Sequence, residues 1–351
     1  MVCPSNSGPS LGQKGPPHKS LREGKHPMKV VYNSRTKPAD ISYISDNFPE
    51  LDFVVTYGPD DIARELPGAE VLFVSNRVYV EEMVAAVNAN ADTLKLIHFT
   101  TSGIDKALKS GGFPKGVKVA NVAGLRAPTL AEHAFALLLA LSHRFRDIEA
   151  ARADHQWLRD EITAKITPLR RQTMCIVGMG ATGQAMARKA KAFDMRVIGV
   201  SRAYQADELV DEVFPRERVH EALAEADAVM ISMPSTAETR GFMNAEKFAA
   251  MKNTAFIVNI ARGDLIDEDD LIAACKAGEI GGAGLDVQMQ EPTPPTSGLW
   301  DVDSIIVSPH VGGGGGGPGD TDLEDMLIEN LKLYVAGKPL KRLVDWESMT
   351  V

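Results

Sequence analysis

A glycine-rich stretch at residues 173–188 constrains the fold of this chain more than any other feature. Residues 174–177 form a short apolar run with the character of a β-strand, and an Ala- and Lys-rich segment of helical character follows. Between them the chain turns through Gly178, Gly180 and Gly183, in the pattern G-x-G-x-x-G. In such a strand–turn–helix the first glycine makes a tight turn and the second lets the backbone approach a pyrophosphate. The third lets the helix pack closely on the strand, so the stretch predicts a dinucleotide site.

The next strand indicates which dinucleotide binds. Residues 196–200 follow at the distance expected within a βαβ unit, and Ser201 and Arg202 come directly after them. Enzymes that use NAD usually carry an acid at this position, which binds the ribose 2′-hydroxyl. A carboxylate would repel a 2′-phosphate, whereas a hydroxyl and a guanidinium can bind one. We therefore predict that NADP(H) is preferred over NAD(H).

Strands alternate with helical segments along most of the chain. Alternation of this kind is typical of parallel sheets covered on both faces, so we predict an α/β protein of two doubly wound domains. The strands are expected at residues 28–32, 52–56, 70–74, 94–99, 117–121, 174–177, 196–200, 228–232, 255–259, 282–286 and 304–308.

Four other segments organise the chain. Residues 1–27 lack apolar periodicity, and we expect a disordered extension with folding beginning at Met28. Residues 129–153 predict one long buried helix that begins with a capping box of Thr129 and Glu132. The six glycines of 312–317 are expected to form a flexible hinge. An amphipathic helix over 322–333 can then return to the first domain.

The composition excludes several classes of function. A net charge of -9 argues against a dedicated nucleic-acid binder. The longest apolar run, 134–141, is too short to span a bilayer. Cys3, Cys175 and Cys275 form no disulfide framework, which favours a reducing, cytoplasmic location. The histidines, cysteines and carboxylates form no metal-type cluster, so we predict no metal.

Three side chains at predicted strand ends carry the expected chemistry. Ligands of open α/β sheets bind outside the carboxyl ends of the strands, and Arg262 and His310 both follow strands. Arg262 offers a planar fork for a carboxylate. His310 can donate and accept a proton near neutral pH, and Glu291 can hold its imidazole in one tautomer.

Five local motifs in fixed order resemble the D-2-hydroxyacid dehydrogenase family. The resemblance covers about residues 71–345, together with the glycine turn, and rests on the segments 259–263, 284–286, 291–292, 299–300 and 308–312. It implies two Rossmann-like domains, one flavodoxin-like and one dinucleotide-binding, with the active site in the cleft between them. The substrate-binding domain would comprise 28–125 plus 319–351, and the dinucleotide-binding domain 126–318.

The resemblance also implies a role for individual residues and a homodimeric assembly. Arg262 would bind the substrate carboxylate, His310 would act as acid and base, and Glu291 would be its partner. Ser102 and Gly103 would contact the substrate. The resemblance places the cofactor against Ala181, Thr182, Ile260, Asp286 and Gly312. The residues themselves already indicate the other cofactor contacts, which are Gly178, Gly180, Gly183, Ser201 and Arg202.

From these observations we predict an NADP(H)-preferring D-2-hydroxyacid dehydrogenase that reduces a small 2-oxo acid such as glyoxylate or hydroxypyruvate, or a larger 2-oxo acid. Two alternatives remain open from the residues alone. A phosphite dehydrogenase-like enzyme also carries Arg, Glu and His in this arrangement. A cofactor-sensing binding scaffold, as some transcriptional corepressors are, can retain the same three residues without turnover.

Overall fold

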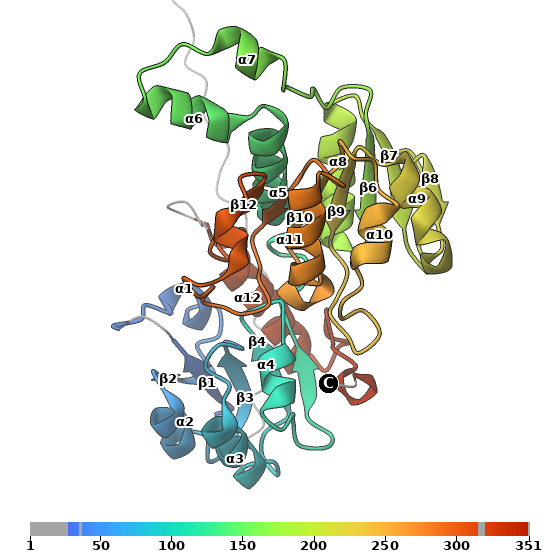
Figure 1. The fold of residues 1–351 in the computed structure, drawn as a ribbon. Helices are drawn as coiled ribbons and strands as arrows, with labels where there is room; N and C mark the ends of the chain where they lie inside the picture. Colours follow the sequence, from blue (N-terminus) through green and yellow to red (C-terminus); the bar gives the residue numbers. More distant parts are fainter. Residues whose placement is uncertain (1–26, 35–36, 315–319, 350–351) are drawn as a thin grey trace, which may run out of the picture.

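The structure is a computed structural model that describes residues 27–34, 37–314 and 320–349, and these residues form two parallel sheets, each covered by helices (Figure 1). The predicted N-terminal extension lies almost wholly outside the described residues, as does the second half of the glycine run. The strands are β1 Lys29–Asn33, β2 Asp52–Thr56, β3 Ala69–Val74, β4 Leu96–Phe99, β5 Lys118–Ala120, β6 Thr173–Val177, β7 Arg196–Val200, β8 Glu212–Phe214, β9 Ala228–Ile231, β10 Phe256–Asn259, β11 Gly282–Leu285 and β12 Ile305–Val307.

The helices connect successive strands and lie on both faces of the sheets. The α-helices are α1 Ser42–Ser45, α2 Pro59–Glu65, α3 Glu81–Ala89, α4 Asp105–Lys109, α5 Ala127–Ser142, α6 Phe145–Ala153, α7 Arg159–Thr163, α8 Ala181–Ala192, α9 Val219–Glu225, α10 Ala245–Ala249, α11 Glu268–Ala277 and α12 Asp322–Val335. The short 3₁₀ helices are η1 Arg216–Arg218, η2 Gly263–Leu265, η3 Gly298–Asp301 and η4 Trp346–Ser348.

The first sheet has the strand order β2-β1-β3-β4-β5, and its strand pairs are parallel. This is the doubly wound order of flavodoxin-like domains. Its central strands β3 and β4 are buried on both sides because α2, α3 and α4 pack on one face while α1 and α12 pack on the other. The apolar face of α12 supplies Leu327, Ile328 and Leu331 to this core, so the end of the chain returns to the first sheet, as predicted.

The second sheet has the order β12-β11-β10-β9-β6-β7-β8, again with parallel pairs. Its strand order reverses between β6 and β9, which is the crevice position where dinucleotides bind in this architecture. Helices α5 and α8 cover one face, and α9, α10 and α11 cover the other. Burial of both faces explains why β6, β7 and β9 are nearly continuous apolar runs rather than alternating ones.

The prediction of a single helix over 129–153 is wrong. The chain forms α5 and α6 with a break at Arg144, whose backbone is left-handed at φ 58°. This conformation redirects the chain, so that α6 leaves α5 at an angle (Figure 1). No Gly or Pro marks the break, so the sequence pattern alone predicts a helix that continues through it.

The predicted capping box is wrong as well. Helix α5 begins at Ala127, with Pro128 in its first turn, and no side chain caps it. A proline suits that position because its missing N–H would have no partner there. Glu132 lies one turn inside the helix and is exposed, and its carboxylate accepts a hydrogen bond from Lys189 Nζ at 3.3 Å.

Candidate active site

The glycine turn after β6 has the geometry that the sequence predicts. Gly178 has a φ of 104°, and a Cβ there would lie 2.6 Å from the backbone N of Met233. A Cβ on Gly183 would lie 2.2 Å from the carbonyl oxygen of Gly178, so helix α8 sits directly on the turn. Gly180 differs from both, because a Cβ on it would meet no atom within 4 Å. The first and third glycines are therefore required by the fold, and the second faces open space.

The amino end of α8 fits the phosphates of a dinucleotide. Gly180 is the N-cap residue, its backbone is extended, and no side chain caps the helix. The N–H groups of the first turn, at Ala181 and Thr182, are thus left for a ligand at the positive end of the helix dipole. The open space over Gly180 allows an anion to approach these groups closely. The residues present therefore fit the pyrophosphate that the sequence predicts.

The end of β7 carries Ser201 and Arg202. The hydroxyl of Ser201 accepts hydrogen bonds from the N–H groups of Ala203, at 3.4 Å, and Tyr204, at 3.2 Å, which fixes the turn. Arg202 is exposed and takes part in none of the ion pairs found among the described residues. A guanidinium that is not already paired can bind an added phosphate at this edge.

Arg262 follows β10 of the second sheet and contacts the loop and helix that follow β4 of the first sheet. Its Nη2 is 3.0 Å from Oδ1 of Asp105, at the start of α4, and its Nη1 donates a hydrogen bond to the carbonyl oxygen of Ala261 at 2.7 Å. A Cβ on Gly103 would lie 2.2 Å from the same Nη2, so the loop after β4 touches the guanidinium. The backbone of Arg262 is held as well, because its carbonyl oxygen accepts from Asn259 Nδ2 at 2.8 Å.

His310 and Glu291 form a hydrogen-bonded pair. Nδ1 of His310 lies 2.7 Å from Oε2 of Glu291, while Oε1 of Glu291 accepts from the backbone N–H of Gln288 at 3.2 Å. His310 follows β12 and has a left-handed backbone, with φ 54°, which is uncommon for a residue other than glycine. Both side chains are partly exposed, so the imidazole can reach a ligand.

The loop that carries Glu291 packs against the loop that carries Arg262. A Cβ on Gly263 would lie 2.0 Å from the backbone C and O of Gln288 and 2.5 Å from the N of Met289. Glu268, in the first turn of α11, accepts a hydrogen bond from the N–H of Met289 at 2.5 Å. The backbone contact at Gly263 therefore ties the position of the arginine to that of the carboxylate.

The carboxylate of Asp286 accepts hydrogen bonds from the loop that follows His310. It is buried, and its Oδ1 accepts from the N–H of Val311 at 2.9 Å and from Ser308 Oγ at 2.7 Å. Its Oδ2 accepts from the N–H of Gly312 at 2.8 Å. His133 Nε2 lies 3.1 Å from Oδ1. The carboxylate is thus engaged on both oxygens, and its predicted contact to the cofactor stays a prediction.

The cluster around Asp286 was not predicted from the sequence. The structure places the ring of His133 against Ser308 and Asp286, next to the loop of His310. No local pattern joins residues that are so far apart in the chain. The one available signal was that Asp286 and Ser308 both follow strands that lie side by side.

The remaining predicted residues have simpler surroundings. Ser102 donates its hydroxyl to the carbonyl oxygen of Val122 at 3.2 Å, which leaves its backbone rather than its side chain for a substrate. Ile260 is buried in the core between the second sheet and α5 and α8. Within the described ranges no group of three or more metal-ligating side chains occurs. None of the described helices is long and apolar enough to cross a membrane.

Comparison with known proteins gives consistent matches. The sequence model of a family described as D-isomer specific 2-hydroxyacid dehydrogenase, NAD binding domain, matches residues 135–312. A glycerate dehydrogenase from Methylorubrum extorquens is 31% identical over 319 residues, which cover 89% of this chain and 97% of the relative. A glyoxylate reductase from Pyrococcus furiosus is 36% identical over 252 residues, which cover 70% of this chain and 72% of the relative.

A solved structure agrees in fold. The NADPH-dependent glyoxylate/hydroxypyruvate reductase from Sinorhizobium meliloti, in complex with NADP and sulfate, superposes with a TM-score of 0.76 and is 25% identical. The superposition covers 91% of this chain and 98% of that protein, so the likeness includes both sheets.

Proposed function

Because this chain belongs to the family of D-isomer-specific 2-hydroxyacid dehydrogenases, and is thus an NAD(P)-dependent oxidoreductase of 2-hydroxy acids, we propose that it is an NADP(H)-preferring reductase of a small 2-oxo acid. Glyoxylate and hydroxypyruvate are the first substrates to consider, since relatives carry these names. The observation that carries the proposal is the pair of His310 and Glu291, placed beside the loop of Arg262.

His310 is the proposed proton donor to the substrate oxygen. Its Nδ1–H donates to the Glu291 carboxylate at 2.7 Å, which orients the ring and leaves Nε2 to face the substrate. An imidazole oriented in this way can pass a proton to the substrate oxygen during reduction. In the oxidation direction the same nitrogen takes the proton back.

Arg262 is the proposed site for the substrate carboxylate. Its guanidinium can make two parallel charge-assisted hydrogen bonds, which set both the position and the orientation of a 2-oxo acid. Gly103 lies directly against this guanidinium, so the backbone of the loop after β4 borders the same site. An acid bound to Arg262 beside this loop presents its oxo carbon in a fixed orientation.

The amino end of α8 and the end of β7 are the proposed cofactor contacts. When bound, the nicotinamide supplies or accepts the hydride. Gly180, Ala181 and Thr182 would hold the pyrophosphate, and Ser201 and Arg202 the 2′-phosphate. Support for NADP(H) comes from the free, exposed guanidinium of Arg202 at the position where NAD-specific enzymes carry an acid, and from the NADPH-dependent relative described above.

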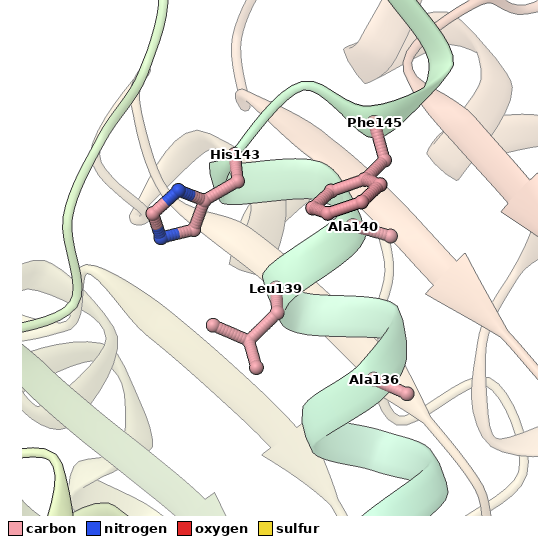
Figure 2. A pocket seen from close by; sticks show the side chains of 5 residues that line it. All are labelled: Ala136, Leu139, Ala140, His143 and Phe145. Atoms are coloured by element: carbon pink, nitrogen blue, oxygen red, sulfur yellow. The ribbon is translucent and has the colours of Figure 1, made fainter. Parts of the chain in front are cut away.

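We also propose that the protein is a homodimer that associates through the outer face of α5 and the segment after it. A hollow of about 430 Å³ lies there, lined by Ala136, Leu139, Ala140, His143 and Phe145 (Figure 2). Phe145 is 54% exposed, and Trp157, on the α6–α7 extension that projects from the body, is 89% exposed. Large apolar groups exposed in this way favour burial against a second copy. A monomeric mass in light scattering at micromolar concentration would contradict this.

The two described cysteines support a cytoplasmic location, which is likewise a proposal. Cys175 and Cys275 are free and buried. Burial raises the pKa of the Cys175 thiol to about 12 and that of Cys275 to about 11, so neither is set up for redox chemistry. Free thiols are the norm in reducing compartments. Cell fractionation with an antibody to the protein tests this assignment.

A rate assay tests the proposed function. NADPH and NADH are each offered with glyoxylate, hydroxypyruvate, pyruvate, phenylpyruvate and 2-oxoisocaproate, and the loss of reduced nicotinamide is followed. We expect turnover with at least one acid and a higher kcat/KM with NADPH. Cofactor binding without turnover of any acid would instead favour a cofactor-sensing scaffold.

A further inference from the structure

Arg262 already holds a carboxylate in this structure, and that carboxylate belongs to the chain itself. Oδ1 of Asp105, the first residue of α4, lies 3.0 Å from Nη2 of Arg262. The two residues are 157 positions apart in the chain. Asp105 follows a strand of the first sheet, and Arg262 follows a strand of the second. Asp105 thus occupies part of the hydrogen-bonding capacity that the proposed function assigns to the substrate.

The contact has the features of one that a ligand can displace. It joins one nitrogen to one oxygen, whereas a free carboxylate can bind an arginine through two parallel hydrogen bonds. The side chains are 39% exposed for Arg262 and 53% exposed for Asp105, and ion pairs in such surroundings add little stability. Exchange of Asp105 for a bidentate ligand is therefore favourable. The free energy of ligand binding is reduced by the cost of breaking the existing ion pair.

The place of this contact is the place where the substrate is expected. A Cβ on Gly103 would lie 2.2 Å from Nη2 of Arg262 and 2.7 Å from Oδ1 of Asp105, so the three groups meet at one point. Partial burial alone would raise the pKa of the Asp105 carboxyl, but the charge of Arg262 and its hydrogen bond outweigh burial and lower this pKa. Asp105 is consequently ionised at neutral pH and carries the same charge as the ligand that it resembles.

We propose that Asp105 is a built-in competitor for the carboxylate site on Arg262 and that it sets how tightly a 2-oxo acid binds. The inference rests on the proposed function, in which Arg262 binds the substrate carboxylate. Asp105 does not touch the reacting atoms; it acts through the arginine. Removing its charge should strengthen the binding of carboxylates and leave the chemical step unchanged.

The test compares Asp105→Asn with the wild-type protein. Asparagine keeps the shape of the side chain but loses its negative charge. Asp61→Asn is the matched control, because Asp61 also pairs with an arginine at 3.0 Å on the first domain and lies on α2, away from the site. Thermal unfolding confirms that each variant folds, and Asp105→Ser is a second neutral variant.

Two readouts are needed. Calorimetric titration with oxalate, in the presence and absence of NADPH, measures carboxylate binding without turnover. We expect Asp105→Asn to bind oxalate about three- to tenfold more tightly than the wild type, as the loss of one like charge near the site implies. The KM for the preferred 2-oxo acid should fall by the same factor, with kcat changed less than about twofold. Asp105→Glu should restore the competition, and Asp61→Asn should match the wild type.

The contrary outcomes separate this inference from the proposed function. Unchanged or weaker oxalate binding in both neutral variants overturns the competitor role, and so does a fall in kcat, which would make Asp105 a support for Arg262. Tighter oxalate binding in a protein that turns over no 2-oxo acid would leave the competitor role standing and overturn the proposed function.

Discussion

Nδ1 of His310 lies 2.7 Å from Oε2 of Glu291, and this pair joins the loop after β12 to the loop after β11. The other carboxylate oxygen of Glu291 accepts from the N–H of Gln288. That residue's backbone passes directly over Gly263, next to Arg262. One chain of contacts therefore fixes the proton donor relative to the proposed carboxylate site.

Replacing Glu291 by Gln should weaken catalysis without unfolding the protein. The amide keeps a similar shape but replaces the charged hydrogen-bond acceptor of Nδ1 by a neutral one, so the imidazole is held less firmly and we expect kcat/KM for the 2-oxo acid to fall about 10- to 100-fold. Thermal unfolding and NADPH affinity should stay at wild-type values. Glu279→Gln, an exposed change outside the site, is the control. Wild-type kcat/KM in Glu291→Gln would show that the pair is not used.

The two helix glycines should respond differently to alanine. In Gly183→Ala the new Cβ would lie 2.2 Å from the oxygen of Gly178, so we expect a lower melting temperature. In Gly180→Ala the Cβ enters open space, so stability should be kept while NADPH binding weakens, because the backbone no longer approaches the phosphates closely. Differential scanning fluorimetry and cofactor titration measure the two effects. Equal stability of both variants would contradict the packing described for α8.

Arg202→Ala should lower the affinity for NADPH and spare that for NADH. One charge-assisted hydrogen bond to a phosphate corresponds to roughly a tenfold or greater change in Kd. Fluorescence titration of both cofactors measures this ratio. Arg170→Ala removes another exposed arginine of the same domain and should leave the ratio unchanged. A wild-type protein that prefers NADH several-fold would contradict the assignment.

The apolar strands were the part of the fold most accessible from sequence. β2 and β7 occupy the predicted residues 52–56 and 196–200, because each is a short run rich in β-branched and other apolar residues. The break between α5 and α6 was not accessible. It depends on the left-handed conformation of Arg144, which no local pattern marks.

The candidate site was likewise only partly predictable from the sequence. Arg262, Glu291 and His310 could be proposed because each follows a predicted strand and the carboxyl ends of parallel strands meet at one edge. Asp105 could not, because its contact with Arg262 depends on how the first sheet's domain meets the second. Local patterns do not encode that placement.

Acid should destabilise the protein partly through His98. This residue is fully buried, its Nε2 accepts from Asn330 Nδ2 at 2.8 Å, and burial lowers its pKa from 6.5 to about 4. The unfolded chain therefore binds a proton that the folded chain rejects. The contribution is complete above pH 6.5 and is lost as the pH falls toward 4, by at most about 1.4 kcal/mol per pH unit.

Urea unfolding at pH 7, 6 and 5 measures this effect by comparison with His98→Gln. The variant has a lower stability at pH 7, but its free energy of unfolding should fall less steeply between pH 6.5 and 5 than that of the wild type. Parallel pH dependences for the two proteins would exclude His98 as the source.

The most direct test of the proposed reduction is the single-turnover rate of NADPH oxidation by the preferred 2-oxo acid in wild-type protein and in His310→Gln. Glutamine cannot donate a proton as an imidazolium does, so the account predicts a rate about 10²- to 10⁴-fold lower. The Kd for NADPH should not change, because His310 does not belong to the turn that holds the pyrophosphate. A variant that keeps its rate within a few-fold of the wild type would contradict the central claim that His310 is the proton donor.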